Sequence, residues 1–239
     1  MGLYSLAAGL LIAAAFGGVW LFWPEGSVYR TAVGGLEAVP MRDGSKVTLN
    51  TDTDIRVLLT RSERRVDLER GEAFFEVAHD TTRPFIVRAG NSRIVVVGTK
   101  FSVRREAHEV RVMVTEGKVR VESGGGAGAA PLTFVRAGNI ARAQESGVLV
   151  SPESAAEAEA ALGWRHGYVV LHDTPIAEAA AEFNRYNMKK IVIQDPGVGE
   201  IRIGGNFRST STDAFVRLLV DGFPIRVEER EGEIVLTHR

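Results

Sequence analysis

The residues best suited to chemistry in this chain are its five histidines and two closely spaced carboxylates. His79 stands next to Asp80, but adjacent residues on a strand point to opposite faces and rarely act on each other. We therefore interpret Asp80 as a turn-capping residue beside a partly buried histidine. No two histidines have the spacing of metal ligands, so no metal site is predicted. The five are His79, His108, His166, His172 and His238.

Two glutamates, Glu72 and Glu76, lie four residues apart. On a strand they share one face, which we expect to be the solvated one. A pair of carboxylates can hydrolyse a glycoside, but no convergent set of catalytic groups accompanies this pair. The glycine-rich run Gly124–Gly128 lacks the Lys-Ser/Thr of a phosphate-binding loop and predicts a flexible connection.

The overall composition excludes several classes of protein. Lys plus Arg number 29 and Asp plus Glu 30, so the basic excess of a nucleic-acid binder is missing. The chain has no cysteine, which excludes disulfides and thiolate metal sites. No cofactor is predicted.

The first segment is uncharged from Leu3 to Trp23. A helix of this length crosses a hydrocarbon core of about 30 Å. Tyr4 at one end, and Trp20 and Trp23 at the other, suit the aromatic belts of a membrane. A secretory signal peptide is the alternative, but the apolar run is longer than its usual core and has no basic residues before it. We expect residues 1–24 to form a transmembrane helix.

Alternating apolar and polar residues dominate the next part of the chain, most clearly from Arg64 to Arg104. This period of two predicts strands with one dry face, and turn residues separate them. About ten such strands in residues 25–150 predict an all-β domain of two sheets or a barrel-like form. The predicted strands are Lys46–Asn50, Asp54–Leu59, Arg65–Glu69, Ala73–Ala78, Phe85–Ala89, Arg93–Val97, Phe101–Arg105, Val110–Thr115, Lys118–Ser123 and Leu132–Arg136.

The remaining residues predict a mixed α/β unit. Residues 151–162 predict a helical linker, with Ser151 as its N-cap and Pro152 at its first position. Residues 163–239 predict the order β-α-β-β-α-β-β, the first helix burying Ile176, Ala179, Ala180 and Phe183. The predicted fold class is therefore mainly β, with a membrane helix first and a small split α/β domain last.

Several motifs occur in the order found in the FecR-type transmembrane regulators, and residues 28–122 resemble their periplasmic domain. Residues 163–239 resemble the STN-like domain that follows it in this family. The first resemblance depends on DGSKVTLN (43–50), RGEAFFEVAHD (70–80), RPF (83–85), VGTKFSV (97–103) and VTEGKV (114–119). The second depends on WRHG (164–167), DTP (173–175), FNRYN (183–187) and GGNF (204–207).

The resemblance implies a single-pass protein of the inner membrane whose C-terminal part is periplasmic. It implies an anti-sigma regulator that relays a signal from the signalling domain of a TonB-dependent outer-membrane receptor to an extracytoplasmic-function sigma factor, typically for iron-siderophore uptake. Family members usually carry a sigma-binding cytoplasmic domain before the span, so direct sigma binding by the chain as given is not expected. The alternatives are a periplasmic carbohydrate-binding or hydrolytic enzyme and an assembly module of a secretion machine.

Two sites follow from these considerations. An unpaired sheet edge can accept a strand from a partner, and we expect Ile201, Arg202, Ile203 and Asn206 to bind the receptor. Some members of the family are cut at the Gly-Thr of this motif, which implies self-cleavage between Gly98 and Thr99 and no other enzymatic activity. A threonine hydroxyl can attack the preceding carbonyl, although Gly98 could equally form a β-bulge. His79 and Glu116 are the nearest guesses for a base.

Overall fold

The computed structural model describes residues 26–123 and 132–239. The expected span Leu3–Trp23 and the expected loop Gly124–Gly128 lie outside the described residues. Within the described residues, no helix has the length and apolar character needed to cross a membrane.

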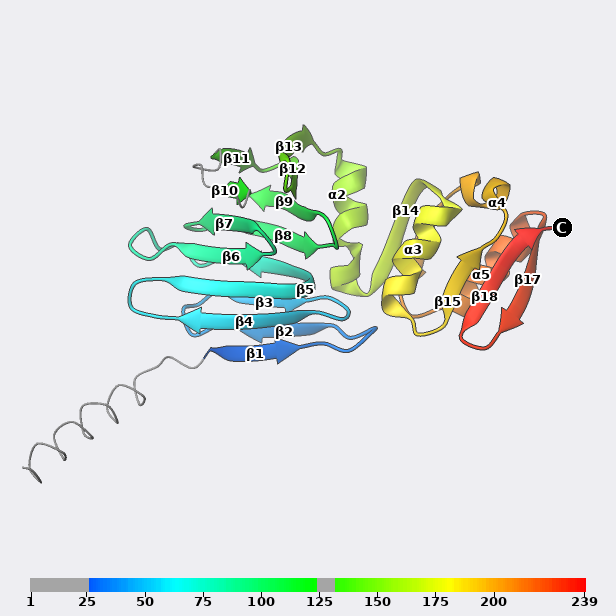
Figure 1. Cartoon of the computed structure of the whole chain (residues 1–239), viewed down its shortest axis with the longest axis horizontal. Helices are drawn as coiled ribbons and strands as arrows, with labels where there is room; N and C mark the ends of the chain where they lie inside the picture. Colours follow the sequence, from blue (N-terminus) through cyan, green and yellow to red (C-terminus); the bar gives the residue numbers. More distant parts are fainter. Residues whose placement is uncertain (1–25, 124–131) are drawn as a thin grey trace, which may run out of the picture.

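The N-terminal domain is a β structure built from two sheets that share one strand (Figure 1). All neighbouring strands are antiparallel except β5 and β6, which are parallel. One sheet contains β1 (Ser27–Arg30), β4 (Asp54–Leu59), the first part of β5 (Arg64–Glu76), β6 (Phe85–Ala89), β7 (Ser92–Val96), β10 (Lys118–Ser123) and β11 (Thr133–Arg136). The other contains β2 (Glu37–Pro40), β3 (Lys46–Leu49), the rest of β5, β8 (Lys100–Arg105), β9 (Val110–Glu116), β12 (Asn139–Gln144) and β13 (Gly147–Pro152).

The long strand β5 joins the two sheets. Its residues up to Arg70 pair with β4 and β6, and its residues from Gly71 pair with β3 and β8. Gly71 has φ of 86°, and a Cβ there would lie 2.4 Å from Thr53 Oγ1, so only glycine fits this position. The two strands predicted at Arg65–Glu69 and Ala73–Ala78 are therefore one strand, because the glycine redirects the ladder without ending it.

Both sheets turn an apolar face toward one core, and the result is a barrel-like body, as the alternation predicts. Phe75 and Phe101 stack in it with ring centroids 5.0 Å apart. The predicted strands omitted β1, β2, β12 and β13. The core residues from both sheets include Val47, Leu49, Ile55, Val66, Leu68, Phe75, Phe85, Val87, Ile94, Phe101, Val103, Val112 and Val121.

A short helical segment follows the barrel-like body. It consists of α2 (Ala155–Leu162) and the 3-10 helix η1 (Gly163–His166). The predicted N-cap, Ser151, is wrong, because it lies in β13 with Pro152. Ser154 caps the helix instead: its hydroxyl accepts from the Glu157 N–H at 3.2 Å, and the Glu157 carboxylate accepts from the Ser154 N–H at 2.8 Å.

The C-terminal domain has the predicted order of elements with one additional short helix, α4. Its strands form two small sheets: β14 pairs with β16, and β18 lies between β15 and β17. The four predicted residues of α3 are buried, and Phe183 of α3 stacks on Phe215 of α5 at 4.2 Å. The elements are β14 (Tyr168–Pro175), α3 (Ile176–Tyr186), β15 (Lys190–Ile193), α4 (Pro196–Glu200), β16 (Arg202–Arg208), α5 (Thr212–Gly222), β17 (Ile225–Arg230) and β18 (Glu233–His238).

Candidate functional site

One face of β5 contacts the C-terminal domain. Glu72, Phe74 and Glu76 alternate along the strand, so they share this face. Phe74 is 2% exposed and belongs to the core of the C-terminal domain, whereas its neighbour Phe75 belongs to the core of the barrel-like body. The Phe-Phe pair therefore anchors β5 in both cores at once.

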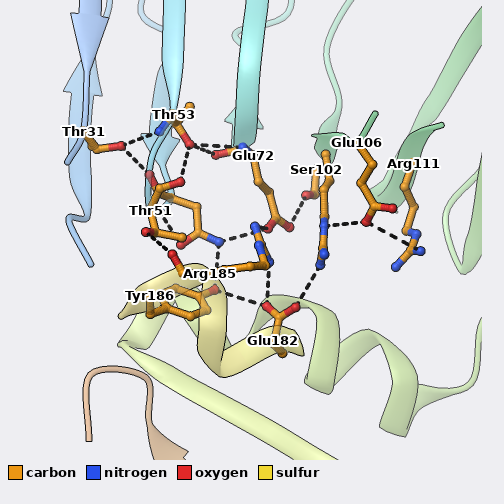
Figure 2. Close-up of polar contacts among 12 residues, drawn as sticks. Thr31, Thr51, Thr53, Glu72, Ser102, Glu106, Arg111, Glu182, Arg185 and Tyr186 are labelled. Atoms are coloured by element: carbon orange, nitrogen blue, oxygen red, sulfur yellow. Dashed lines mark hydrogen bonds and ion pairs between the residues drawn. The ribbon is translucent and has the colours of Figure 1, made fainter. Parts of the chain in front are cut away.

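A chain of charged side chains that includes Glu72, Arg185 and Glu182 crosses the interface (Figure 2). Arg185 of α3 donates to Glu72 Oε2 at 2.7 Å and to Glu182 Oε1 at 2.5 Å. Arg104 of β8 donates to Glu182 Oε2 at 3.0 Å. Because the side chain of Glu72 is only 6% exposed and that of Arg185 only 19%, water screens their interaction little.

Neutral polar groups complete the network (Figure 2). The Asn50 amide donates one hydrogen bond to Glu72 Oε2 and one to the Tyr186 hydroxyl, each at 2.9 Å. The Thr51 hydroxyl donates to the Arg185 carbonyl at 3.0 Å. Asn50 and Thr51 follow β3, so they lie at an edge of the barrel-like body where its backbone turns toward the C-terminal domain.

The charges of this network stabilise one another. Burial alone would raise the pKa of Glu182, but Arg185 and Arg104 outweigh it and hold that pKa below its usual range. Burial opposes the charge on Arg185, yet Glu72 and Glu182 keep the pKa of Arg185 above its ordinary value. Burial and the charge of Glu182 raise the pKa of Tyr186, which stays a neutral phenol. The interface is thus ion-paired at neutral pH.

A second contact between the domains lies farther along β5. The guanidinium of Arg165, in η1, lies over the Phe74 ring at 3.8 Å from its centroid. The same group is 3.8 Å from Glu76 Oε1. Hence the expectation that Glu72 and Glu76 share a solvated face is wrong for Glu72, which is 5% exposed, because the C-terminal domain covers that face.

The Gly98-Thr99 peptide lies in the turn between β7 and β8. A Cβ on Gly98 would be 2.6 Å from His79 Nδ1, so the residue must be glycine unless His79 moves. Thr99 is 4% exposed, and its hydroxyl donates to the Lys118 carbonyl at 3.2 Å. Both residues line a pocket of about 390 Å³ together with His79 and Glu116.

The side chains of the adjacent residues His79 and Asp80 make different contacts. The Asp80 carboxylate accepts from the Thr82 hydroxyl and N–H and from the Arg83 backbone and side chain, and these bonds hold the pKa of Asp80 well below its usual range. Asp80 is thus the turn-capping residue that the sequence predicts. His79 instead packs against Gly98.

The four predicted partner-binding residues lie on or just before β16. Arg202 and Asn206 are exposed, and Arg202 pairs with Asp173 at 3.1 Å. Ile203 is 9% exposed and belongs to the core of the C-terminal domain, against which the half-buried Ile201 also packs. The side chain of Ile203 is therefore unavailable to a partner, which could contact only its backbone.

Apart from Glu72, the sequence analysis did not single out the residues that join the domains, and it did not predict that Glu72 does so. Asn50 ends the motif at 43–50, and Arg185 and Tyr186 lie within the motif at 183–187. Each motif marks its own domain, and neither indicates that the two meet in space. The only hint was Phe74-Phe75, two adjacent large apolar residues in an otherwise alternating strand.

Comparisons with known proteins agree with this arrangement. Residues 27–120 match the family described as FecR protein. Two crystal structures of a proposed anti-sigma factor from Parabacteroides distasonis, at 1.65 and 2.50 Å resolution, are 27% identical to this chain with TM-scores of 0.71 and 0.70. They cover 89% and 90% of this chain and 99% of their own. No curated protein matches the chain.

Proposed function

We propose that this chain is a FecR-type protein, with its FecR domain at residues 27–120, and that it regulates a sigma factor in response to a partner bound outside the cytoplasm. Leu3–Trp23 holds it in the inner membrane, and residues from 25 onward lie in the periplasm. The partner is the signalling domain of a TonB-dependent outer-membrane receptor, and the regulated genes serve iron-siderophore uptake. The similarity to the Parabacteroides distasonis protein supports the regulatory class.

The observation that carries the proposal is the buried contact between Arg185 and Glu72. Arg185 belongs to the domain that offers a strand edge to a partner, and Glu72 belongs to β5, which runs through both sheets of the FecR domain. Because separating the partners of a buried ion pair leaves a buried charge uncompensated, the two domains should respond to a bound partner together. A binding event on the C-terminal domain therefore reaches the FecR domain without a flexible linker between them.

Calorimetry tests the docking part of the proposal. The signalling domains of the host's TonB-dependent receptors are purified and titrated one by one into the full chain in detergent. At least one should bind, and Arg202→Glu should weaken that binding because it reverses a charge on the exposed edge strand. The proposal fails if none of them binds, or if residues 25–150 alone bind as tightly as the full chain.

A second proposal, self-cleavage between Gly98 and Thr99, draws support from their shared pocket with His79 and Glu116. The Thr99 hydroxyl attacks the Gly98 carbonyl carbon, the C–N bond breaks, and the nitrogen takes a proton to leave an ester. Water then hydrolyses the ester to a Gly98 carboxylate and restores the Thr99 hydroxyl. The strands on either side, β7 and β8, belong to one core and would hold the fragments together.

Intact-mass spectrometry decides this second proposal. The wild-type protein should show two fragments, with a new N-terminus at Thr99, and Thr99→Ala should remain one chain with unchanged circular dichroism. If the wild-type protein stays a single chain through long incubation, the self-cleavage proposal is wrong and the Gly98-Thr99 turn has only a structural role.

A further inference from the structure

The outer face of the β14–β16 sheet is only partly covered. Val169 and Leu171 of β14 point into the core of the domain. Because side chains alternate along a strand, Tyr168 and Val170 point to the opposite, outer face. The helical segment of α2 and η1, called the linker from here on, packs closely over this outer face: a Cβ on Gly163 would lie 2.5 Å from Val170 Cγ2. The linker therefore forms one wall above the sheet and leaves Tyr168 37% exposed beside it.

A groove of about 480 Å³ lies between this wall and the sheet. Its wall is formed by the linker, and its floor by the outer face of β14 and β16. Its apolar and aromatic side chains are Ala158 and Leu162 from the linker and Tyr168 and Val170 from β14. Its charged and polar side chains are Glu159, Arg165 and His166 from the linker and Asn206 from β16.

The groove borders a strand edge with free hydrogen-bonding capacity. Among residues 26–123 and 132–239, β16 pairs with β14 alone, so one edge of β16 has no ladder partner. At the centre of β16, Gly204 and Gly205 are both exposed and present bare backbone. Glycine inside a strand is typical of a place where another backbone approaches closely. The edge is thus open to a further strand.

Charge distinguishes this edge from that of β17, an edge strand of the other small sheet. β16 reads RIGGNFR, with an arginine at each end and no acidic residue. β17 reads IRVEER, and its two glutamates balance its two arginines. Arg208, at the end of β16 nearest Tyr168, has its guanidinium 5.9 Å from that ring and makes no ion pair among the described residues. A strand that prefers β16 to β17 therefore carries acidic residues.

We propose that the partner adds an extended strand to the free edge of β16, inserts one large apolar side chain into the groove, and sets a carboxylate against Arg208. This inference rests on the proposed docking of a receptor signalling domain to the C-terminal domain, and it names the surface and the chemistry of the docked strand. Main-chain hydrogen bonds supply affinity and the groove supplies specificity, as in other strand-addition complexes.

The experiment uses the full chain and the receptor signalling domain that binds it in the calorimetric screen. Ala158→Trp fills the groove from the linker helix and should raise the Kd at least tenfold. Ala156→Trp, on the exposed side of the same helix, is the matched control and should change the Kd less than twofold. Arg208→Glu should also raise the Kd tenfold, whereas Arg226→Glu on β17 should leave it unchanged.

Amide hydrogen exchange in the same complex reports strand addition directly. The backbone amides of 204–207 that face the free edge should exchange at least tenfold more slowly when the partner is bound. Wild-type affinity for both Ala158→Trp and Arg208→Glu, or unchanged exchange at 204–207, overturns the inference while the docking itself stands. No binding by the wild-type chain overturns both.

Discussion

Removing the charge of Arg185 should loosen the contact between the two domains. Arg185→Met keeps most of the length of the side chain but leaves Glu72, 5% exposed, without its cationic partner. Breaking a buried ion pair from one side costs about 3–5 kcal/mol. Because Asn50 and Ser102 still donate to Glu72, the lower end of that range, ~3 kcal/mol, is expected. For a protein of this size, the melting temperature falls by roughly 6–12 °C.

Urea unfolding measures this loss, and the fluorescence of Trp164 reports it at the interface. Trp164 is the only tryptophan after residue 25, and it is buried in the core of the C-terminal domain. In the double variant Arg185→Met/Glu72→Gln no buried charge is left unpaired, so part of the stability should return. Lys189→Met, which breaks an exposed pair with Glu229, should cost no more than about 0.5 kcal/mol.

Two outcomes would refute this reasoning. A loss below about 1 kcal/mol for Arg185→Met would mean that water screens the network as it does an exposed pair. Additive losses in the double variant would mean that Arg185 and Glu72 do not interact energetically.

Three further predictions follow from other parts of the chain. The pKa of Glu182 is lower in the folded protein than in the unfolded chain, so its charge stabilises the fold above the unfolded pKa of about 4.3, and this stabilisation is lost as the pH falls through the folded pKa. Glu182→Gln should therefore cost ~1–2 kcal/mol at pH 7 and almost nothing at low pH. A cost that does not depend on pH in urea titrations would contradict this. Gly71→Ala should lower stability by several kcal/mol, because its Cβ would lie 2.4 Å from Thr53 Oγ1 at φ 86°. Gly138→Ala is the control: Gly138 also has a positive φ but lies in open space, so the change should cost only the backbone strain of about 1 kcal/mol. Equal melting temperatures for the two variants would argue against the steric account. The full chain should stay in the membrane fraction after alkaline carbonate washing and a version starting at Glu25 should be soluble, so full chain in the wash would count against a span at Leu3–Trp23.

Local patterns in the sequence were enough to predict most strands and both long helices of the C-terminal domain. Period-two alternation follows from burial of one strand face, so β6, β9 and β10 were found close to their observed bounds. The helix α3 was found through its buried positions, such as Phe183. The helix start at Ser151 was wrong because a complete capping box at Ser154 and Glu157 competes with it.

The contacts between domains could not be predicted in this way. Glu72 is polar and lies on an alternating strand, so a rule based on one sheet places it in solvent. Its actual partner, Arg185, is 113 residues away along the chain, and nothing in either local pattern links the two. The same reason explains Ile203, which lies on an edge strand yet points its side chain into the core.

The most direct test of the regulatory role is a reporter gene driven by the sigma factor that responds to the bound receptor's ligand. Cells in which the gene encoding this chain is deleted should lose the ligand-dependent change in reporter activity, and the intact gene should restore it. Arg185→Met should restore it only partly, because the two domains are then less firmly coupled. Identical reporter responses with and without the chain would contradict the proposed function.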